Sequence, residues 1–284
     1  MNISETKLEA GLYLVATPIG NARDITLRAL DILASVDVIA AEDTRTARKL
    51  CDLHGVKIGN RPLIAYHDHS GEKGRAGLLK LLGEGKSLAY VSEAGTPLVS
   101  DPGYALAREA GAAGYLVTSA PGPSAALAAL SLSGLPSDRF LFAGFAPSGA
   151  SARRKWLTDL LQCPATLIVY ESPKRLVALL DDLAEIGGET RRAAICRELT
   201  KKFEEVRRGE VGDLRRGLEE DPVRGEVVLL VEYQKPEMTP EEVDQAIENA
   251  LKTMRVKDAA KAVSEAIGLP KREIYQRALQ LSGR

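Results

Sequence analysis

Short apolar runs alternate with amphipathic stretches along the first half of the chain. The apolar runs predict buried strands at 12–17, 36–41, 63–67, 87–91 and 116–119. The stretches between them predict helices at 25–34, near 45–54, and at 73–82, 104–112 and 125–132, with Asp24 as the expected N-cap of the first. This alternation predicts a mostly parallel sheet with helices on both faces, whose ligands lie beyond the carboxyl ends of the strands.

The pattern changes near 137–149, where three of the four phenylalanines gather and a stretch rich in Ser, Gly and Arg follows. We interpret this region as the passage into a second α/β domain, and these aromatic residues as core or dimer contacts rather than base-stacking platforms. Further strands are expected at 165–170, 192–197 and 227–231, and an amphipathic helix ends near 185. After Pro236 the strand-like runs cease, and 256–267 and 272–281 predict a helix, a turn and a second helix.

The predicted fold class is therefore α/β. We expect an N-terminal α/β domain at 1–119, a second α/β domain at 120–236 and a helical segment at 237–284. Whether this last segment contacts RNA or only packs on the main body is open.

Composition narrows the possible environments and partners. With 38 basic and 39 acidic residues, nucleic-acid binding must depend on local patches. One such patch lies at 191–216, with nine basic and five acidic residues. The three cysteines are widely spaced without a zinc-ligand pattern, which favours a reducing compartment and argues against a structural metal. No window approaches the roughly 18 apolar residues of a spanning helix, so we expect a cytoplasmic protein without membrane contact.

Loops rich in Gly, Pro and polar residues follow the predicted strands. The loop with the most such residues lies in YVSEAGTPLVSDPG at 90–103. Its composition suits a small-molecule site, although a tight turn without a ligand would look similar. PGPS at 121–124 precedes an Ala/Leu-rich helix, where free N–H groups would suit a phosphate, a carboxylate or a ribose. The P-loop, Rossmann and GxSxG motifs are all missing. What remains is a set of strand-end loops spread over two domains, TPIGN, AEDTR, HDH, SEAGTPLVSDPG, PGPSAA, YESPKR, RELTK and RGEV, which are able to line one inter-domain cleft.

Eight of these segments together match a known family. From about Gly11 to Glu232 the chain resembles the bacterial 16S rRNA cytidine 2′-O-ribose methyltransferases of the small ribosomal subunit, which belong to the tetrapyrrole-methylase-like superfamily of S-adenosylmethionine (SAM) enzymes. The one visible departure is Glu93, where Asp is commoner, and it keeps the charge. The matching segments are TPIGNARDITLRAL, AAEDTR, HDH, SEAGTPLVSDPG, PGPSAALAALSLSGLPSDRF, YESPKRL, RELTKKFE and RGEVVLLVE.

The resemblance implies two α/β domains with SAM bound in the cleft between them, and a homodimer. Methyl transfer from a sulfonium needs no metal, so none is expected. It implies that the acceptor is a cytidine in the decoding centre of 16S rRNA within the small (30S) subunit. The cofactor-binding positions that it implies are Pro18, Gly20, Glu93, Ala94, Gly95, Thr96, Pro97, Val99, Ser100, Ser124, Ala125, Tyr170, Gly225 and Glu226.

Methylation of a ribose hydroxyl needs in-line positioning and a group that accepts or polarises its proton. Asp43 and Lys201 are the first candidates, and Glu42 and Lys174 follow. Each has a structural alternative, because Asp43 could simply cap the next helix and the lysines could be solvated. His67, His69 and Glu198 are further cleft candidates, and Asp43, Glu93 and Asp101 are suitable charges for a sulfonium.

Two other functions stay open at this stage. The protein could use SAM to methylate a tetrapyrrole or another small molecule. The basic clusters and the near-full-length match argue against this alternative. The chain could also be a non-enzymatic ribosome-assembly factor, which would require degenerate loops.

Overall fold

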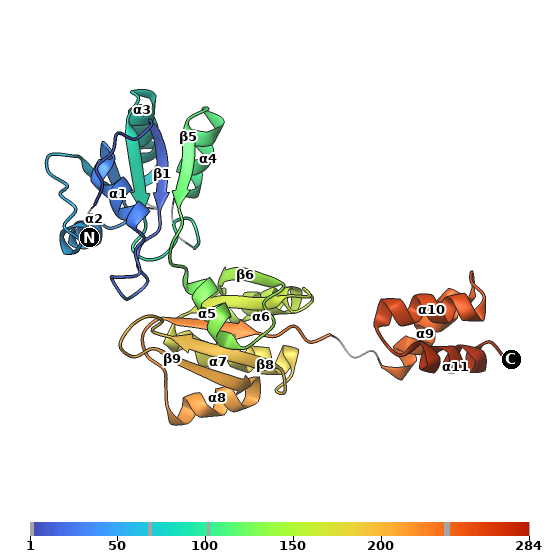
Figure 1. The fold of residues 1–284 in the computed structure, drawn as a ribbon. Helices are drawn as coiled ribbons and strands as arrows, with labels where there is room; N and C mark the ends of the chain where they lie inside the picture. The colour runs from blue at the N-terminus through green and yellow to red at the C-terminus, as the bar shows by residue number, and fades with distance from the viewer. Residues whose placement is uncertain (1–2, 68–69, 101–102, 236–238, 284) are drawn as a thin grey trace. The chain divides into compact units, whose positions relative to one another are not determined.

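The computed structural model describes residues 3–67, 70–100, 103–235 and 239–283. The chain divides into two compact units, Met1–Tyr233 and Gln234–Arg284 (Figure 1). Within the part that the structure describes, no helix combines the length and apolar character needed to cross a bilayer.

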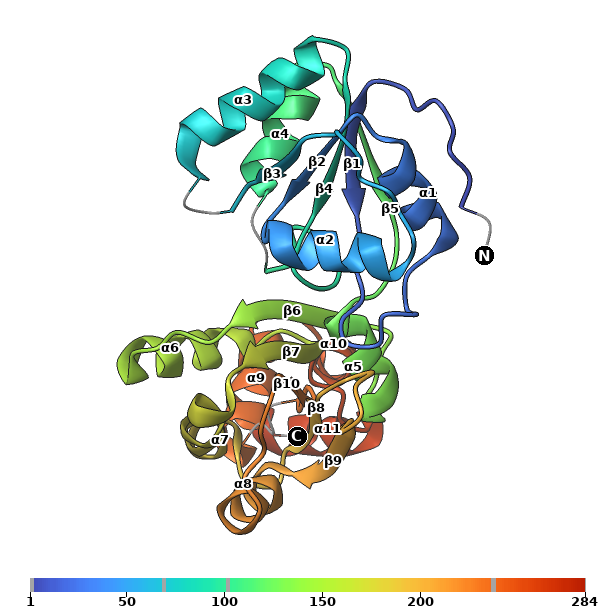
Figure 2. The ribbon, with the colours of Figure 1, turned by 90° about the vertical axis from the view of Figure 1, so that its left-hand side faces the viewer.

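A parallel five-stranded sheet forms the first lobe of the larger unit. Its strand order is β3-β2-β4-β1-β5, and every neighbouring pair is parallel, as the alternation of strands and helices predicts (Figure 2). Because all strands run the same way, their carboxyl ends and the loops that follow lie at one edge. The strands are β1 (Gly11–Val15), β2 (Val38–Ala41), β3 (Leu63–Ala65), β4 (Ser87–Val91) and β5 (Leu116–Ala120).

Helices cover both faces of this sheet. Leu30 and Leu33 of α1 (Leu27–Ser35) and Ala47 of α2 (Thr44–Leu53) are buried in one core cluster. On the other face, α3 (Gly71–Gly83) and α4 (Tyr104–Ala112) contribute Leu78, Leu82, Leu106 and Ala110 to a second cluster. Alternate residues of the central strands β1, β2 and β4 supply the two clusters, and this explains why these strands are almost wholly apolar.

The N-cap of α1 differs from the expectation. Thr26 caps this helix and its hydroxyl accepts a hydrogen bond from the backbone N–H of Ala29 at 3.1 Å, so the assignment to Asp24 is wrong. Both residues are good caps by type, and only the helix start distinguishes them.

The second lobe is built on a mixed sheet of order β6-β7-β10-β8-β9. β6 and β7 are parallel, whereas β10 is antiparallel to both β7 and β8, and β8 is antiparallel to β9. The sequence patterns did not assign β6, α6, β9 or α8. The elements of this lobe are β6 (Phe140–Phe145), α6 (Ala150–Leu160), β7 (Thr166–Glu171), α7 (Pro173–Gly187), β8 (Arg192–Arg197), β9 (Glu205–Glu210), α8 (Val211–Glu220) and β10 (Val227–Val231).

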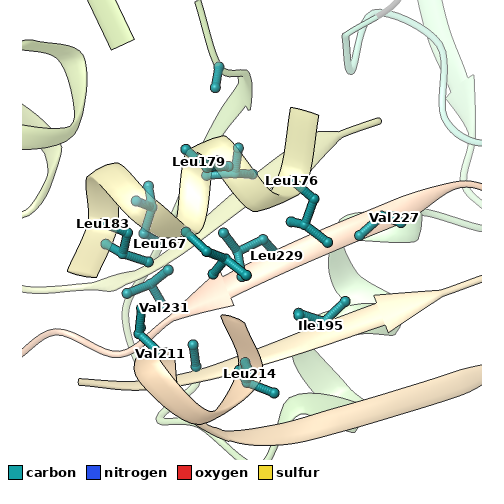
Figure 3. Close-up of a cluster of buried hydrophobic side chains, with 14 of the residues drawn as sticks. Leu167, Leu176, Leu179, Leu183, Ile195, Val211, Leu214, Val227, Leu229 and Val231 are labelled. Atoms are coloured by element: carbon teal, nitrogen blue, oxygen red, sulfur yellow. The ribbon is translucent and has the colours of Figure 1, made fainter. Parts of the chain in front are cut away.

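One face of the second sheet carries the largest core cluster. Figure 3 shows Leu176 and Leu179 of α7 above Leu229 of β10, with Val211 and Leu214 of α8 beneath. All five side chains are buried. The alternate strand residues face the opposite way, toward another helix.

That helix is α5 (Ala125–Ser133), which follows β5 of the first sheet but packs on the second. Its Ala126, Ala129 and Leu130 share a buried cluster with Ile168 and Val228. The segment that enters α5 therefore ties the two lobes together, and it does so beside the loops at the carboxyl edge of the first sheet.

The second unit is a three-helix bundle of α9 (Pro240–Leu251), α10 (Val256–Ile267) and α11 (Lys271–Leu281). Thr239 and Glu242 form a reciprocal capping box at the start of α9. Val243, Ile247, Val263, Ile274 and Ala278 form the core of the bundle.

Candidate functional site

A cavity of about 450 Å³ lies where loops of the first sheet meet the second lobe. This volume is within the range of small-molecule sites. Its lining residues are Ile19, Glu42, Glu93, Ala94, Gly95, Thr96, Val99, Ser100, Ser124, Ala125, Phe145, Tyr170, Glu171, Ser172, Pro173, Cys196, Leu199, Gly225, Glu226, Val227 and Val228.

The β4–α4 loop forms one wall of the cavity and is held at two points. The backbones of Thr17 and Gly95 exchange hydrogen bonds of 2.9 and 3.0 Å, and Thr96 Oγ1 donates to the carbonyl of Pro123 at 2.9 Å. Leu98 and Ser100 adopt left-handed conformations, with φ of 72° and 61°. Such strain persists only where the surroundings enforce it, and it concentrates at ligand sites.

The start of α5 forms a second wall. Ser124 is the N-cap of this helix, yet its hydroxyl makes no capping hydrogen bond. The backbone N–H of Ala126 donates instead to the hydroxyl of Tyr170, at the end of β7, at 3.1 Å. The Tyr170 ring makes edge contacts with Phe142 and Phe145, at centroid distances of 4.7 and 5.7 Å.

Antiparallel pairing brings the RGEV segment to the same place. Val227 at the start of β10 pairs with Glu171 at the end of β7, so Gly225 and Glu226 lie beside the β7 carboxyl end. Gly225 has a φ of 84°, and a Cβ there would overlap the carboxylate of Glu198. Glycine satisfies both constraints.

Lys201 is fixed between two carboxylates at the rim. Its Nζ donates to Glu198 Oε1 at 2.9 Å and to Glu226 Oε2 at 3.0 Å. Burial alone would lower the pKa of Lys201, but the bonds to Glu198 and Glu226 outweigh it and raise this pKa. The pKa of Glu198 is lowered, first by the backbone N–H of Glu226 and then by Lys201. Lys201 is therefore a cation at neutral pH.

The β8–β9 loop that carries Lys201 also touches the first lobe. Glu198 and Thr200 in this loop have left-handed φ values of 48° and 63°. Thr200 Oγ1 accepts from the backbone N–H of Asn21 at 2.9 Å. A Cβ on Gly20 would lie 2.5 Å from Lys201 Cγ and 2.7 Å from Thr200 Oγ1, so Gly20 permits this close approach.

Most of the expected cofactor-binding residues line the cavity, and three do not. Pro18, Gly20 and Pro97 are outside the lining, although each is next in sequence to a lining residue, Ile19 or Thr96. Asp101 and His69 lie outside the described residues.

The four catalytic candidates differ in whether they line the cavity. Asp43 is the N-cap of α2, and its carboxylate accepts from Arg45, whose hydrogen bonds lower the Asp43 pKa to about 2. Lys174 is exposed and does not line the cavity. Lys201 reaches it through Glu226 only. Glu42 does line it, and Glu42 Oε2 accepts from the Glu93 backbone N–H at 3.1 Å.

The charge of the cavity is one-sided. Among its described lining residues are the four glutamates Glu42, Glu93, Glu171 and Glu226, and none is Lys, Arg or His. Glu171 is buried, with Oε1 accepting from the Ser172 N–H at 2.7 Å and Oε2 3.0 Å from the Arg175 guanidinium. Glu171 is thus balanced by Arg175, and Glu226 by Lys201, whereas Glu42 and Glu93 make no ion pair with the described residues. These two carboxylates favour a cationic ligand over an anionic one. The described residues contain no group of three or more His, Cys, Asp or Glu side chains arranged to hold a metal.

Several lining residues were not singled out from the sequence, although most of them lie in or beside the strand-end loops expected at the cleft. Phe145, expected in a core or dimer contact, is not in the core: it is 57% exposed and lines the cavity. Burial raises the pKa of the Cys196 thiol to about 11, so it lines the wall as a neutral side chain. Val227 and Val228, at the start of β10, line the cavity because β10 runs antiparallel to β7 and β8, and the sequence does not show this direction. The others in this group are Ile19, Glu171, Ser172, Pro173, Leu199, Val227 and Val228.

Comparison with known proteins agrees with this architecture. The family model "Tetrapyrrole (Corrin/Porphyrin) Methylases" matches residues 11–215, and "RsmI C-terminal HTH domain" matches residues 237–282. A solved structure of uroporphyrin-III C-methyltransferase from Thermus thermophilus, complexed with S-adenosylhomocysteine, has a TM-score of 0.54 at 18% identity and covers 78% of this chain and 97% of its own.

Curated relatives are closer in sequence. The chain is 46% identical over 276 residues to "Ribosomal RNA small subunit methyltransferase I" of Mesorhizobium japonicum, covering 96% of this chain and 93% of that protein. It is 44% identical to the protein of the same name from Escherichia coli O157:H7, covering 96% of each. The chain therefore belongs to the tetrapyrrole (corrin/porphyrin) methylase family, and within it to the ribosomal RNA small subunit methyltransferase I group, which confirms the resemblance and the prediction of a methyltransferase.

Proposed function

We propose that the protein methylates the ribose 2′-oxygen of a cytidine in the decoding centre of 16S rRNA, with SAM as the methyl donor. The observation that carries the proposal is the acidic cavity at the junction of two sheets, in a chain 44–46% identical to ribosomal RNA small subunit methyltransferases I.

The cavity fits SAM in size and charge. SAM carries a sulfonium and an ammonium against one carboxylate, so its net positive charge is complementary to the carboxylates of Glu42 and Glu93, which make no ion pair with the described residues. Polar backbone groups of the β4–α4 loop and the start of α5 suit the methionine and ribose portions. Tyr170, Val228 and Leu199 supply apolar surface for the adenine.

When bound, SAM supplies an electrophilic methyl group at its sulfonium. The residues of the chain must then position the ribose hydroxyl and receive its proton. We assign the proton acceptor to Glu42, because it is the one of the four candidates that lines the cavity. Lys201 is a protonated lysine that holds Glu226, and the Asp43 carboxylate is committed to Arg45 and the α2 cap.

The site of methylation is tested directly. Purified protein is incubated with methyl-labelled SAM and either 30S subunits or a porphyrinogen, and any label is mapped by nuclease digestion and mass spectrometry. We expect label on the 2′-oxygen of one cytidine. Label on a base, or on the porphyrinogen alone, would refute the proposal and favour a different acceptor. Absence of label on both would favour an assembly factor.

The role of Glu42 is tested by Glu42→Gln. The amide oxygen can still accept from the Glu93 N–H, so the loop is retained while the proton acceptor is removed. We expect kcat at saturating SAM to fall by about 10²-fold or more. The Kd for SAM should rise by a smaller factor, because the cavity loses one carboxylate charge. A kcat close to that of the unaltered protein would exclude Glu42 as the base.

We also propose that the protein acts in the cytoplasm as a homodimer. Exposed apolar side chains on α5 and β6 support a self-association surface, because Leu127, Leu132 and Phe140 are 51%, 37% and 45% exposed. Light scattering of Leu127→Glu should show a monomer where the unaltered protein shows a dimer. A monomeric unaltered protein would refute the proposal.

A further inference from the structure

The acidic cavity poses a problem for an RNA substrate. Its described lining carries four glutamates and no basic residue, so the phosphates that flank a target ribose need cations nearby. The basic stretch at 191–216 is a poor source, since most of its cations already have partners. The ion pairs are Arg192–Glu232, Arg197–Glu205, Lys201–Glu198, Arg207–Glu205, Arg215–Asp181 and Arg216–Asp213.

A second hollow, of about 380 Å³, lies along α2 on the first lobe. Its lining residues are Thr44, Arg45, Arg48, Lys49, Asp52 and Leu63. Thr44, Arg48 and Asp52 follow one another at intervals of four positions, as do Arg45 and Lys49, so these residues form two adjacent rows on one side of the helix. Leu63 begins the edge strand β3, and the hollow is therefore a groove between α2 and the sheet edge.

The cations of this groove differ in their partners. Arg45 is paired with Asp43, at 2.7 Å between Nη2 and Oδ2, although its side chain remains 91% exposed. Arg48 and Lys49 are exposed and make no ion pair or side-chain hydrogen bond with the residues that the structure describes. Asp52 is the one acidic member of the described lining. Two cations are thus available to an external anion.

The groove on α2 adjoins the acidic cavity along the chain. Glu42, which lines the cavity, is two residues before the first residue of α2. At 1.5 Å of helix rise per residue, Arg48 and Lys49 lie roughly 8 Å along the helix from the Asp43 cap. Figure 2 shows α2 at the edge of the first lobe that faces β6 of the second. An RNA chain whose target nucleotide enters the cavity can therefore continue over the α2 groove.

We infer that the groove on α2 binds the phosphodiester backbone of the substrate RNA, next to the nucleotide that is methylated, through Arg48 and Lys49. This inference rests on the proposed function, since it concerns the same substrate. It divides the work between two sites: an acidic cavity that takes a cationic donor, and a basic groove that takes the anionic chain.

The test uses the full-length protein with Arg48→Gln and Lys49→Gln together. The matched control is Lys80→Gln with Lys86→Gln, two exposed lysines at the end of α3 and just before β4, away from the carboxyl edge of the sheet. Binding to 30S subunits is measured at several salt concentrations, and SAM binding is measured by equilibrium dialysis.

We expect the groove variant to bind 30S subunits roughly tenfold more weakly or worse, with a shallower dependence of log K on log salt, by about 0.7 for each lost phosphate contact. SAM affinity and the control variant should be unchanged. Unchanged 30S affinity and salt slope would overturn the inference. Weaker binding with an unchanged salt slope would also overturn it, because it would indicate a ribosomal protein instead of RNA. The proposed function fails separately, if the unaltered protein places its label elsewhere.

Discussion

Substitution of Gly20 by alanine tests whether the two lobes really meet at the TPIGN loop. The added Cβ would lie 2.5 Å from Lys201 Cγ, 2.7 Å from Thr200 Oγ1 and 2.9 Å from the carbonyl oxygen of Leu199. The φ of Gly20 is outside the left-handed range that disfavours other residues. The effect of the substitution is therefore steric and not a matter of backbone strain.

The loss of stability depends on which of the atoms near the added Cβ can move. The lysine stem can move, but Thr200 is held by the Asn21 N–H and the Leu199 oxygen belongs to the backbone. Overpacking of this kind costs about 1–3 kcal/mol. In a unit of this size, that lowers Tm by roughly 2–12 °C. If the β8–β9 loop moves away instead, Glu226 moves with Lys201 and SAM affinity falls, tenfold for about 1.4 kcal/mol.

Differential scanning fluorimetry and SAM titration measure both outcomes. The matched control is Gly77→Ala in α3, where nothing lies within 4 Å of the added Cβ and where alanine favours the helix. We expect Gly77→Ala to leave Tm unchanged or raised. A Gly20→Ala protein with unchanged Tm and unchanged SAM affinity would show that the two lobes do not touch at this point.

Two further predictions follow from the rim charges. Asp43→Asn keeps a good cap for α2 and should retain kcat within about threefold, as single-turnover methylation would show; a hundredfold loss would return Asp43 to the role of base. Lys201→Met should cost about 1 kcal/mol in urea unfolding at neutral pH, since both side chains of its pair with Glu198 are partly exposed, at 29% and 19%. Because the pKa of Glu198 is lowered and that of Lys201 is raised, this difference should hold from about pH 5 to 10 and shrink below pH 4.5 and above pH 10.5; a pH-independent difference would contradict the ion pair.

The sequence predicted the first lobe well because its central strands β1, β2 and β4 are buried on both faces and form apolar runs. Each strand of this sheet is followed by a loop, whose place at the carboxyl edge is dictated by parallel pairing. The resemblance then supplied residues that composition alone could not select, such as Tyr170 and Gly225.

The second lobe was harder to predict for physical reasons. β9 is an edge strand with sequence EVRRGE, where charged residues protect the edge from pairing and remove the apolar signal. α6 buries Arg153, which pairs with Asp182 at 2.7 Å, so its inward face looks polar. Glu171 and Cys196 reach the cavity through antiparallel neighbours, and no local pattern shows strand direction in a mixed sheet.

The position of β10 governs the order in which this protein can mature during synthesis. It is the last strand to leave the ribosome, yet it occupies the middle of its sheet, between β7 and β8. The N-terminal lobe can assemble early, since all five of its strands precede residue 121. α5 must wait for its partner surface until residues 227–231 are present. The strands of the N-terminal lobe are therefore all synthesised about a hundred residues before the cavity wall at the start of β10.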